Sequence, residues 1–236
     1  EGSSAISMIH GSDEGVLNIS GATIRNNKGS YAITFNTSGN DDNQKVNDSI
    51  IEGNQITNND GGIKLESRLG VYGVSIVNNN ISGNTSTEDG AAISINGTSN
   101  YKGNIEIKGN TISNNTATRG GAIWTNQDIT LEDNTITGNE ATEAGGAICT
   151  TYDTEINIIG GEISGNRDGT EDTRADSSGI RNGVNRNRKS VVSLSSGTIV
   201  SDGIEAGTVE VSGKVNMTGY LSTTTSVGYT VVGALD

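Results

Sequence analysis

Few side chains in this 236-residue chain are of the types that perform acid–base or nucleophilic chemistry. It has one histidine, one cysteine and one tryptophan, which are His10, Cys149 and Trp124. Cleavage of an acidic polysaccharide needs a strong base, or two or three carboxylates that converge on one bond. Glu106 and Glu132 come nearest to such a pair, and no histidine aligns with Cys149. A polysaccharide lyase or hydrolase therefore stays an alternative function without a defined set of catalytic residues.

Metal ligands are also sparse. The sequence "DGTED" at 168–172 offers carboxylate oxygens, but it lacks the full pattern of a calcium-binding loop. We expect no cofactor and no metal site, and Ca²⁺ is the one ion that the sequence leaves open.

Composition and charge exclude several classes of protein. Hydrophobic residues make up 31% of the chain and aromatic residues 3%, which is a small supply for an ordinary globular core. The formal net charge of −13 opposes binding to nucleic acid or to an anionic membrane. No apolar run approaches the roughly 18 residues of a membrane-spanning helix, so we expect no membrane insertion of this segment.

An internal repeat indicates the elements that position these side chains. Each copy has an aliphatic residue, one spacer, a second aliphatic residue, four spacers and a third aliphatic residue, and a new copy begins about every 30 residues. The alternation is that of a strand with one face buried. The full copies are Leu17, Ile19, Ile24; Val74, Ile76, Ile81; Ile105, Ile107, Ile112; Ile129, Leu131, Ile136; Ile156, Ile158, Ile163; and Val192, Leu194, Ile199.

Polar residues mark the corners of each copy. Pairs such as "GN" at 109 and "DN" at 133 accept a positive φ angle, which predicts a bend between two strands. The third aliphatic residue opens an Ile-x-x-Asn phrase, as in "ISNN" at 112, and we expect these asparagines to stack, with each amide donating to the next carbonyl. A glycine phrase, "GGAI" at 120 and again at 145, introduces a third strand.

Three short strands per repeat predict an all-β fold, a single-stranded right-handed parallel β-helix of about eight coils with a capped C-terminal end. The handedness follows from the general preference of parallel crossover connections. We expect an N-terminal cap over 1–14 and the β-helix over 15–219, with a long loop excursion at 166–190. The remaining 220–236 would form a C-terminal cap or a junction to a following domain.

Alignment of the repeats predicts a column of outward side chains on the third strand. The column contains Thr34, Lys64, Ser94, Trp124, Cys149 and Arg181. An exposed indole on a flat sheet is a platform for a sugar ring or for an apolar side chain of a partner. Alternatively, Trp124 lies under a loop such as "NTSTED" or "NEATEA" and serves as a local cover. We interpret Cys149 as an inert thiol.

The excursion at 166–190 is the second candidate for a binding surface. It is acidic in its first part and basic in its second. Insertions in solenoids gather on one face and frequently bind partners, whereas the alternative here is a self-neutralising loop. The residues expected to bind a partner are Lys64, Ser94, Trp124, Cys149, Arg181, Arg186 and Arg188.

The alternation of "GGAI" with an aromatic-or-aliphatic-x-x-Asn phrase resembles the repeats of the chlamydial polymorphic outer membrane protein family. The phrases "GGEISGN" at 160 and "SGKVNMTG" at 212 resemble glycine-rich repeats in large surface proteins of gut Firmicutes. The likeness covers about residues 15–166 and continues more weakly to 219, although this chain carries Ile where Phe is usual in the chlamydial pattern.

The resemblance implies an extracellular module on a bacterial cell surface, part of a longer surface-anchored chain. It would act as an adhesin that binds a host glycoprotein or glycan, of the mucin or secreted immunoglobulin class. A passive surface stalk without a ligand is a further alternative. No functional residue carries over from the resemblance, because such repeats specify a fold better than a ligand.

Overall fold

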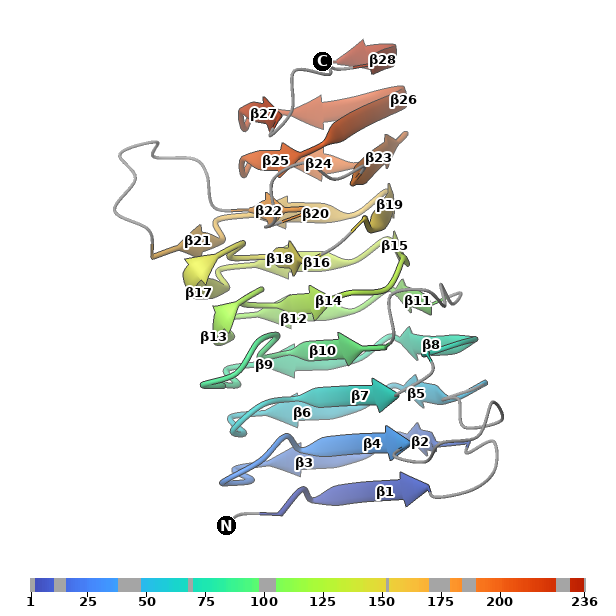
Figure 1. Cartoon of the computed structure of the whole chain (residues 1–236), viewed down its shortest axis with the longest axis vertical. Helices are drawn as coiled ribbons and strands as arrows, with labels where there is room; N and C mark the ends of the chain where they lie inside the picture. Colours follow the sequence, from blue (N-terminus) through green and yellow to red (C-terminus); the bar gives the residue numbers. More distant parts are fainter. Residues whose placement is uncertain are drawn as a thin grey trace.

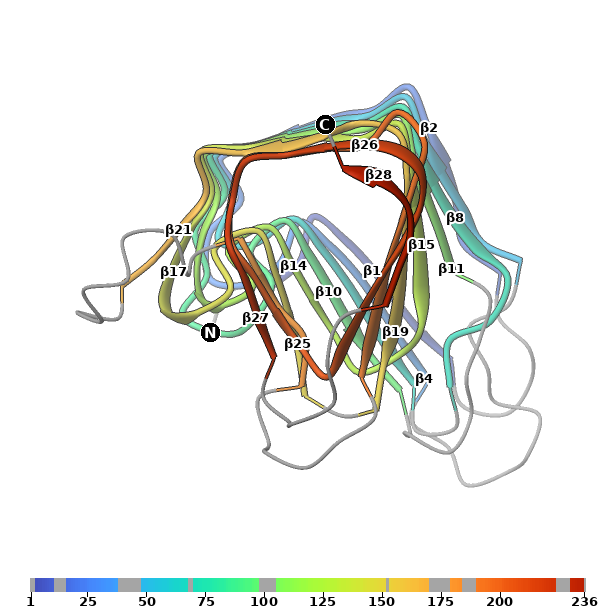
Figure 2. The same ribbon diagram turned by 90° about the horizontal axis from the view of Figure 1, so that it is seen from above.

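The strands are stacked in one column that runs from the N-terminal to the C-terminal end (Figure 1). The computed structural model describes residues 3–10, 16–37, 48–67, 70–97, 105–151, 153–169, 179–183, 190–223 and 230–235. Seen along the column, the chain runs counterclockwise while it rises toward the viewer (Figure 2). The predicted right-handed parallel β-helix is therefore confirmed.

Face A is a parallel sheet of nine strands and includes the strands that follow the glycine phrases. It is built from β1 (Ile6–His10), β4 (Ile33–Thr37), β7 (Ile63–Ser67), β10 (Ile93–Asn96), β14 (Ile123–Thr125), β18 (Ile148–Thr150), β22 (Ile180–Arg181), β25 (Ile204–Ala206) and β27 (Leu221–Thr223).

Faces B and C carry the paired aliphatic residues and the third aliphatic residue of each repeat. Face B is built from β2 (Asn18–Ser20), β5 (Ile50–Glu52), β8 (Val74–Val77), β11 (Ile105–Lys108), β15 (Ile129–Glu132), β19 (Glu155–Ile159), β23 (Val191–Ser195) and β28 (Thr230–Leu235). Face C is built from β3 (Thr23–Arg25), β6 (Gln55–Thr57), β9 (Asn80–Ser82), β12 (Thr111–Ser113), β16 (Thr135–Thr137), β20 (Glu162–Ser164) and β24 (Ile199–Val200). The long strand β26 (Thr208–Met217) runs through both faces and joins them into one 16-stranded sheet.

A small additional sheet lies beside the corner between faces C and A. It contains β13 (Thr116–Arg119), β17 (Glu140–Ala144) and β21 (Arg167–Asp168), and we call it the arm. Figure 2 shows β17 and β21 of the arm projecting from the outline of the tube.

The number of regular coils differs slightly from the predicted eight. In the described part of the chain, six turns have the regular three-strand form, and they begin at β2, β5, β8, β11, β15 and β19. The turns that begin at β23 and β26 are less regular, because β24 has only two residues and the ten residues of β26 continue across a corner.

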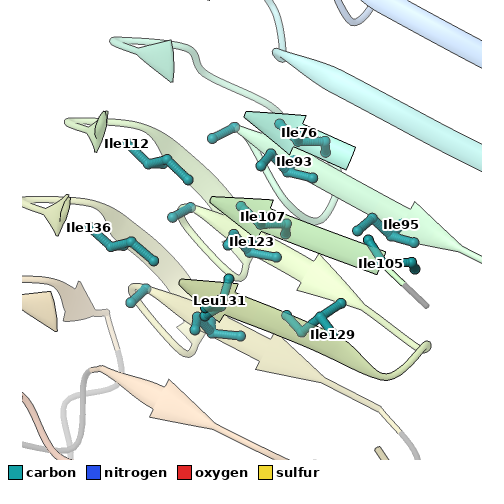
Figure 3. Packing of buried hydrophobic residues seen from close by; sticks show 14 of the residues in the cluster. Ile76, Ile93, Ile95, Ile105, Ile107, Ile112, Ile123, Ile129, Leu131 and Ile136 are labelled. Atoms are coloured by element: carbon teal, nitrogen blue, oxygen red, sulfur yellow. The ribbon is translucent and has the colours of Figure 1, made fainter. Parts of the chain in front are cut away.

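Stacked aliphatic side chains fill the tube. Ile107, Leu131 and Ile158 lie in register on successive strands, and none is more than 2% exposed. Figure 3 shows Ile107 and Leu131 in the interior together with isoleucines from the other faces, such as Ile112 and Ile123. Full burial of such a side chain contributes about 1.5–3 kcal/mol, so a narrow core stabilises the coil without aromatic residues.

The alignment of the repeats is wrong at Ile199, which was expected to point inward. Ile199 is 41% exposed, whereas Val200 is buried and lies in register with Ile163. The bend before this strand is one residue longer than in the other copies. Thr198 lies two residues before Val200, where its hydroxyl oxygen accepts a hydrogen bond from the backbone N–H of Gly160 at 3.1 Å.

Asparagines form the predicted ladder at the corner between face C and the arm. Both the backbone N–H and the Nδ2 amide of Asn84 donate to Oδ1 of Asn115 at 2.9 Å, and Asn115 repeats this pattern with Asn139. The buried members of this ladder are Asn59, Asn84, Asn115, Asn139 and Asn166. At its end the carboxylate of Asp202 accepts from Nδ2 of Asn166 at 2.6 Å.

A second buried ladder lies at the corner between faces B and C, and the sequence analysis did not predict it. Its members are Asn54, Asn79, Asn110 and Asn134. In this bend the residue with positive φ precedes the ladder asparagine, as Gly109 (φ 64°) precedes Asn110. The expected bend and the buried amide are therefore two parts of one corner motif.

The glycine pair of "GGAI" is required by close backbone packing. Gly120 has a φ of 60°, and a Cβ atom there would collide with the carbonyl of Ile123. A Cβ at Gly121 would collide with the carbonyls of Gly146 and Glu140. The pair thus lets the chain pass tightly from the arm into face A.

We predict that Asn115→Ala lowers the free energy of unfolding by about 1–3 kcal/mol for each buried group that loses its partner. These groups include the carbonyl of Ile81, which accepts from Asn115 Nδ2 at 3.0 Å. Chemical denaturation measures the effect. Asn157→Ala on face B is the control, because that side chain is partly exposed and should change stability little. Equal effects of the two substitutions would contradict the ladder's structural role.

Candidate functional site

The predicted column on face A exists in the expected register. Lys64 pairs with Ser94, Ser94 with Trp124, Trp124 with Cys149, and Cys149 with Arg181. The repeat alignment therefore brought together five residues that come from five separate coils.

The expectation that Trp124 stands on a solvent-exposed face is wrong. Trp124 is only 9% exposed, Ser94 5% and Cys149 0%. Trp124 and Cys149 form a small cluster with Ala144, the last residue of arm strand β17. Ala144 belongs to the "NEATEA" segment, so the structure selects the interpretation in which Trp124 lies under a local cover.

Charged residues surround this covered cluster. The guanidinium of Arg119 donates to both carboxylate oxygens of Asp89, at 3.0 and 2.5 Å, which joins adjacent coils. Arg181 lies 3.5 Å from the carboxylate of Glu205. Burial raises the pKa of the Cys149 thiol to about 12, although Arg119 and Arg181 act in the opposite direction. The thiol is therefore protonated at neutral pH and is not an activated nucleophile.

A surface cleft of about 260 Å³ lies at the corner between faces C and A in the first three coils. The loops between the C and A strands line it, at the position that the arm takes in later coils. Its lining residues are Gly29, Ser30, Tyr31, Asp60, Thr85, Ser86, Thr87 and Glu88.

Hydrogen bonds fix the shape of the cleft. The phenol of Tyr31 donates to the backbone carbonyl of Asp89 at 2.7 Å and accepts from Ser86 Oγ at 3.2 Å. Asp60 accepts from the backbone N–H of Gly29 at 2.7 Å and from Lys28 at 2.9 Å. These contacts, led by the N–H of Gly29, lower the pKa of Asp60, so the cleft carries a carboxylate at neutral pH.

Lys64 connects the predicted column to this cleft. Its Nζ lies 2.7 Å from the Glu88 carboxylate and 5.5 Å from the centroid of the Tyr31 ring. Burial, with a contribution from Glu88, raises the pKa of Tyr31 to about 12, so the phenol stays a neutral donor. The result is a polar recess with hydroxyl groups and carboxylates, an arrangement suited to hydrogen bonding with hydroxylated ligands.

The sequence analysis did not predict this cleft. The one residue type in the sequence that reflects the packing of Tyr31 is Gly61. A Cβ atom at this position would lie 2.6 Å from Cδ1 of the Tyr31 ring. Without an aligned column that contains Tyr31, the repeat pattern gave no reason to place the ring beside Asp60 and Glu88.

The remaining candidate residues are not brought into one site. Glu132 pairs with Lys108 at 2.7 Å, while Glu106 lies beside Thr130 in a different outward column. Arg186 and Arg188 lie outside the described residues, as does "TED" of the calcium candidate at 170–172. Within the described ranges no three His, Cys, Asp or Glu side chains are grouped so that they could hold a metal ion. The same ranges contain no helix that is long and apolar enough to cross a membrane.

Two successive turns match a known repeat. Residues 104–126 and 128–151 match the model of the Chlamydia polymorphic membrane protein repeat. This chain is a β-helix repeat protein that is similar to the polymorphic membrane proteins. The first match includes β11 to β14 and the second β15 to β18, so one family repeat corresponds to one turn with its arm strand.

The repeat indicates a protein associated with a surface or an outer membrane. No curated protein and no solved structure matches the chain. The two matched segments are one fifth of the chain, and they include the covered residues Trp124 and Cys149.

We predict that the sole tryptophan and the sole cysteine are both shielded by the arm. In the native protein, Trp124 emission should be blue-shifted and resistant to acrylamide, and Cys149 should resist alkylation until the chain unfolds. A Cys149→Ala, Thr135→Cys variant is the matched control, because Thr135 is exposed on face C and a thiol there should react at once. Rapid alkylation of native Cys149 would contradict the described cover.

Proposed function

We propose that this protein is an extracellular module of a bacterial cell surface, acting as an adhesin that binds a host glycoprotein or glycan. The cleft at the corner of faces C and A is the observation that carries the proposal. The match to a surface-associated repeat supports the location, and the regular stack of coils holds the cleft residues in fixed positions.

The chemistry of the cleft supports a sugar as the group that is bound. The hydroxyls of Thr85 and Thr87 have no side-chain hydrogen bond within the described chain, and one Glu88 oxygen is held by Lys64. Sugars present dense hydroxyl groups that donate to carboxylates and exchange hydrogen bonds with threonine hydroxyls. The acidic rim opposes anionic sugars, so the proposed ligand group is a neutral or amino sugar.

The predicted binding residues have different parts in this proposal. Lys64 positions Glu88. Ser94, Trp124 and Cys149 do not line the cleft, and Trp124 and Cys149 pack against the arm residue Ala144. Arg181 and the undescribed Arg186 and Arg188 are proposed as a second contact through the excursion.

We predict that Glu88→Gln combined with Thr85→Val weakens glycoprotein binding about tenfold, a loss of about 1.4 kcal/mol. An array of mucins, secreted immunoglobulins and their released glycans measures the effect. Glu106→Gln combined with Thr130→Val is the matched control on face B and should bind as the wild type does. An Arg186→Ala, Arg188→Ala variant tests the second contact.

Two outcomes would overturn the proposal. If the wild-type protein binds nothing on the array, the passive stalk is the better description. If it shortens or eliminates uronic acid polymers, with or without calcium, it is a polysaccharide-cleaving enzyme instead of an adhesin.

A further inference from the structure

The outer surface of face C is a regular array of small polar side chains. The strands β6, β9, β12 and β16 pair without a register shift, so their outward residues form two straight columns. The first column contains Gln55, Asn80, Thr111 and Thr135. The second contains Thr57, Ser82, Ser113 and Thr137.

This array carries no charge, although the chain has 28 acidic and 15 basic residues. The nearest charged residues of the same columns are Arg25 on β3 and Glu162 on β20, one at each end. Four consecutive coils of an acidic protein thus present an uncharged face. A charged polymer would find no partner for its charges there, and its desolvation would not be offset.

The hydroxyl groups of the array are not used by the fold. The six Ser and Thr hydroxyls form no hydrogen bond within the described chain, and the one side-chain contact in the array joins Asn80 Nδ2 to Gln55 Oε1 at 2.9 Å. On the next strand, by contrast, Ser164 donates to Glu162 at 2.6 Å. Each free hydroxyl has one donor and two acceptor positions that a ligand can use.

The array is also accessible. The flat upper side of the outline in Figure 2, along which β26 is labelled, is face C, and the arm projects from the corner beside it. Thr111 and Thr135 are exposed, and their neighbours in the second column are half-buried.

We propose that face C between β6 and β16 binds an extended, uncharged polysaccharide whose chain lies along the axis of the column. Successive rows of the array are separated by the strand spacing of about 4.8 Å. An extended chain of β-linked hexoses advances by a similar step with each sugar, so each sugar meets one row of hydroxyl and amide groups. This site shares no residue with the cleft and does not depend on the proposed glycoprotein binding.

The test uses native gel electrophoresis through hydroxyethyl cellulose, a neutral β-linked glucan, with alginate as the anionic comparison. We expect hydroxyethyl cellulose to retard the wild-type protein and alginate to have no effect. The variant Thr111→Glu, Thr135→Glu should lose about tenfold in affinity, because it places two carboxylates in the array. Thr130→Glu, Ser193→Glu is the matched control, with the same added charge on face B.

The readouts separate this site from the cleft and from misfolding. Thermal unfolding and Trp124 emission should be the same in both charge variants, and the Glu88→Gln, Thr85→Val variant should keep its retardation. Absence of retardation of the wild type, or equal loss in both charge variants, would overturn this inference while leaving the cleft untouched. A change from dimer to monomer in the Thr111→Glu, Thr135→Glu variant would also overturn it, since a second copy of the chain would then occupy face C.

Discussion

The structure depends on hydrogen bonding at the corners of a tube that is filled with aliphatic side chains. The corner between faces B and C and the corner between faces C and A bury backbone groups that no strand partner satisfies, and an unpaired group of this kind costs about 1–3 kcal/mol. The two asparagine ladders satisfy them, because each side chain accepts from the backbone N–H of the asparagine one coil earlier and donates to a carbonyl. Asn115, for example, donates to Ile81 and to Asn139 and accepts from Asn84. Only an amide of this length does all three.

The ladders also determine what the outer faces present. Because each corner repeats at one strand spacing, the strands between corners stay in register, and outward side chains form straight columns. The same regularity produces the covered column under the arm, the polar array on face C and the cleft in the first three coils. Differences between coils therefore arise from single residues, such as Tyr31 and Trp124, placed on a constant scaffold.

Much of this architecture was predictable from sequence, because the pattern of Ile and Asn residues directly encodes a coil. The register of Lys64, Ser94, Trp124, Cys149 and Arg181 followed from the glycine phrases alone. The covering of Trp124 did not, because the arm strands consist of Thr, Ala and charged residues and carry no aliphatic alternation. The sequence pattern also did not predict that Val200 faces inward in place of Ile199. A bend with one extra residue changes which of two neighbouring side chains is buried. The cleft depends on loop packing around Tyr31, which no periodic pattern records.

The exchange of asparagine side-chain amide protons tests the central claim most directly. In ¹⁵N-labelled protein transferred to heavy water, the Nδ2 protons of Asn84, Asn115 and Asn139 should exchange far more slowly than those of the partly exposed Asn157, because they open only with the coil itself. Exchange of the three buried amides at the rate of Asn157 would contradict the account, since the corners would then be hydrated and the ladders would not hold the coils together.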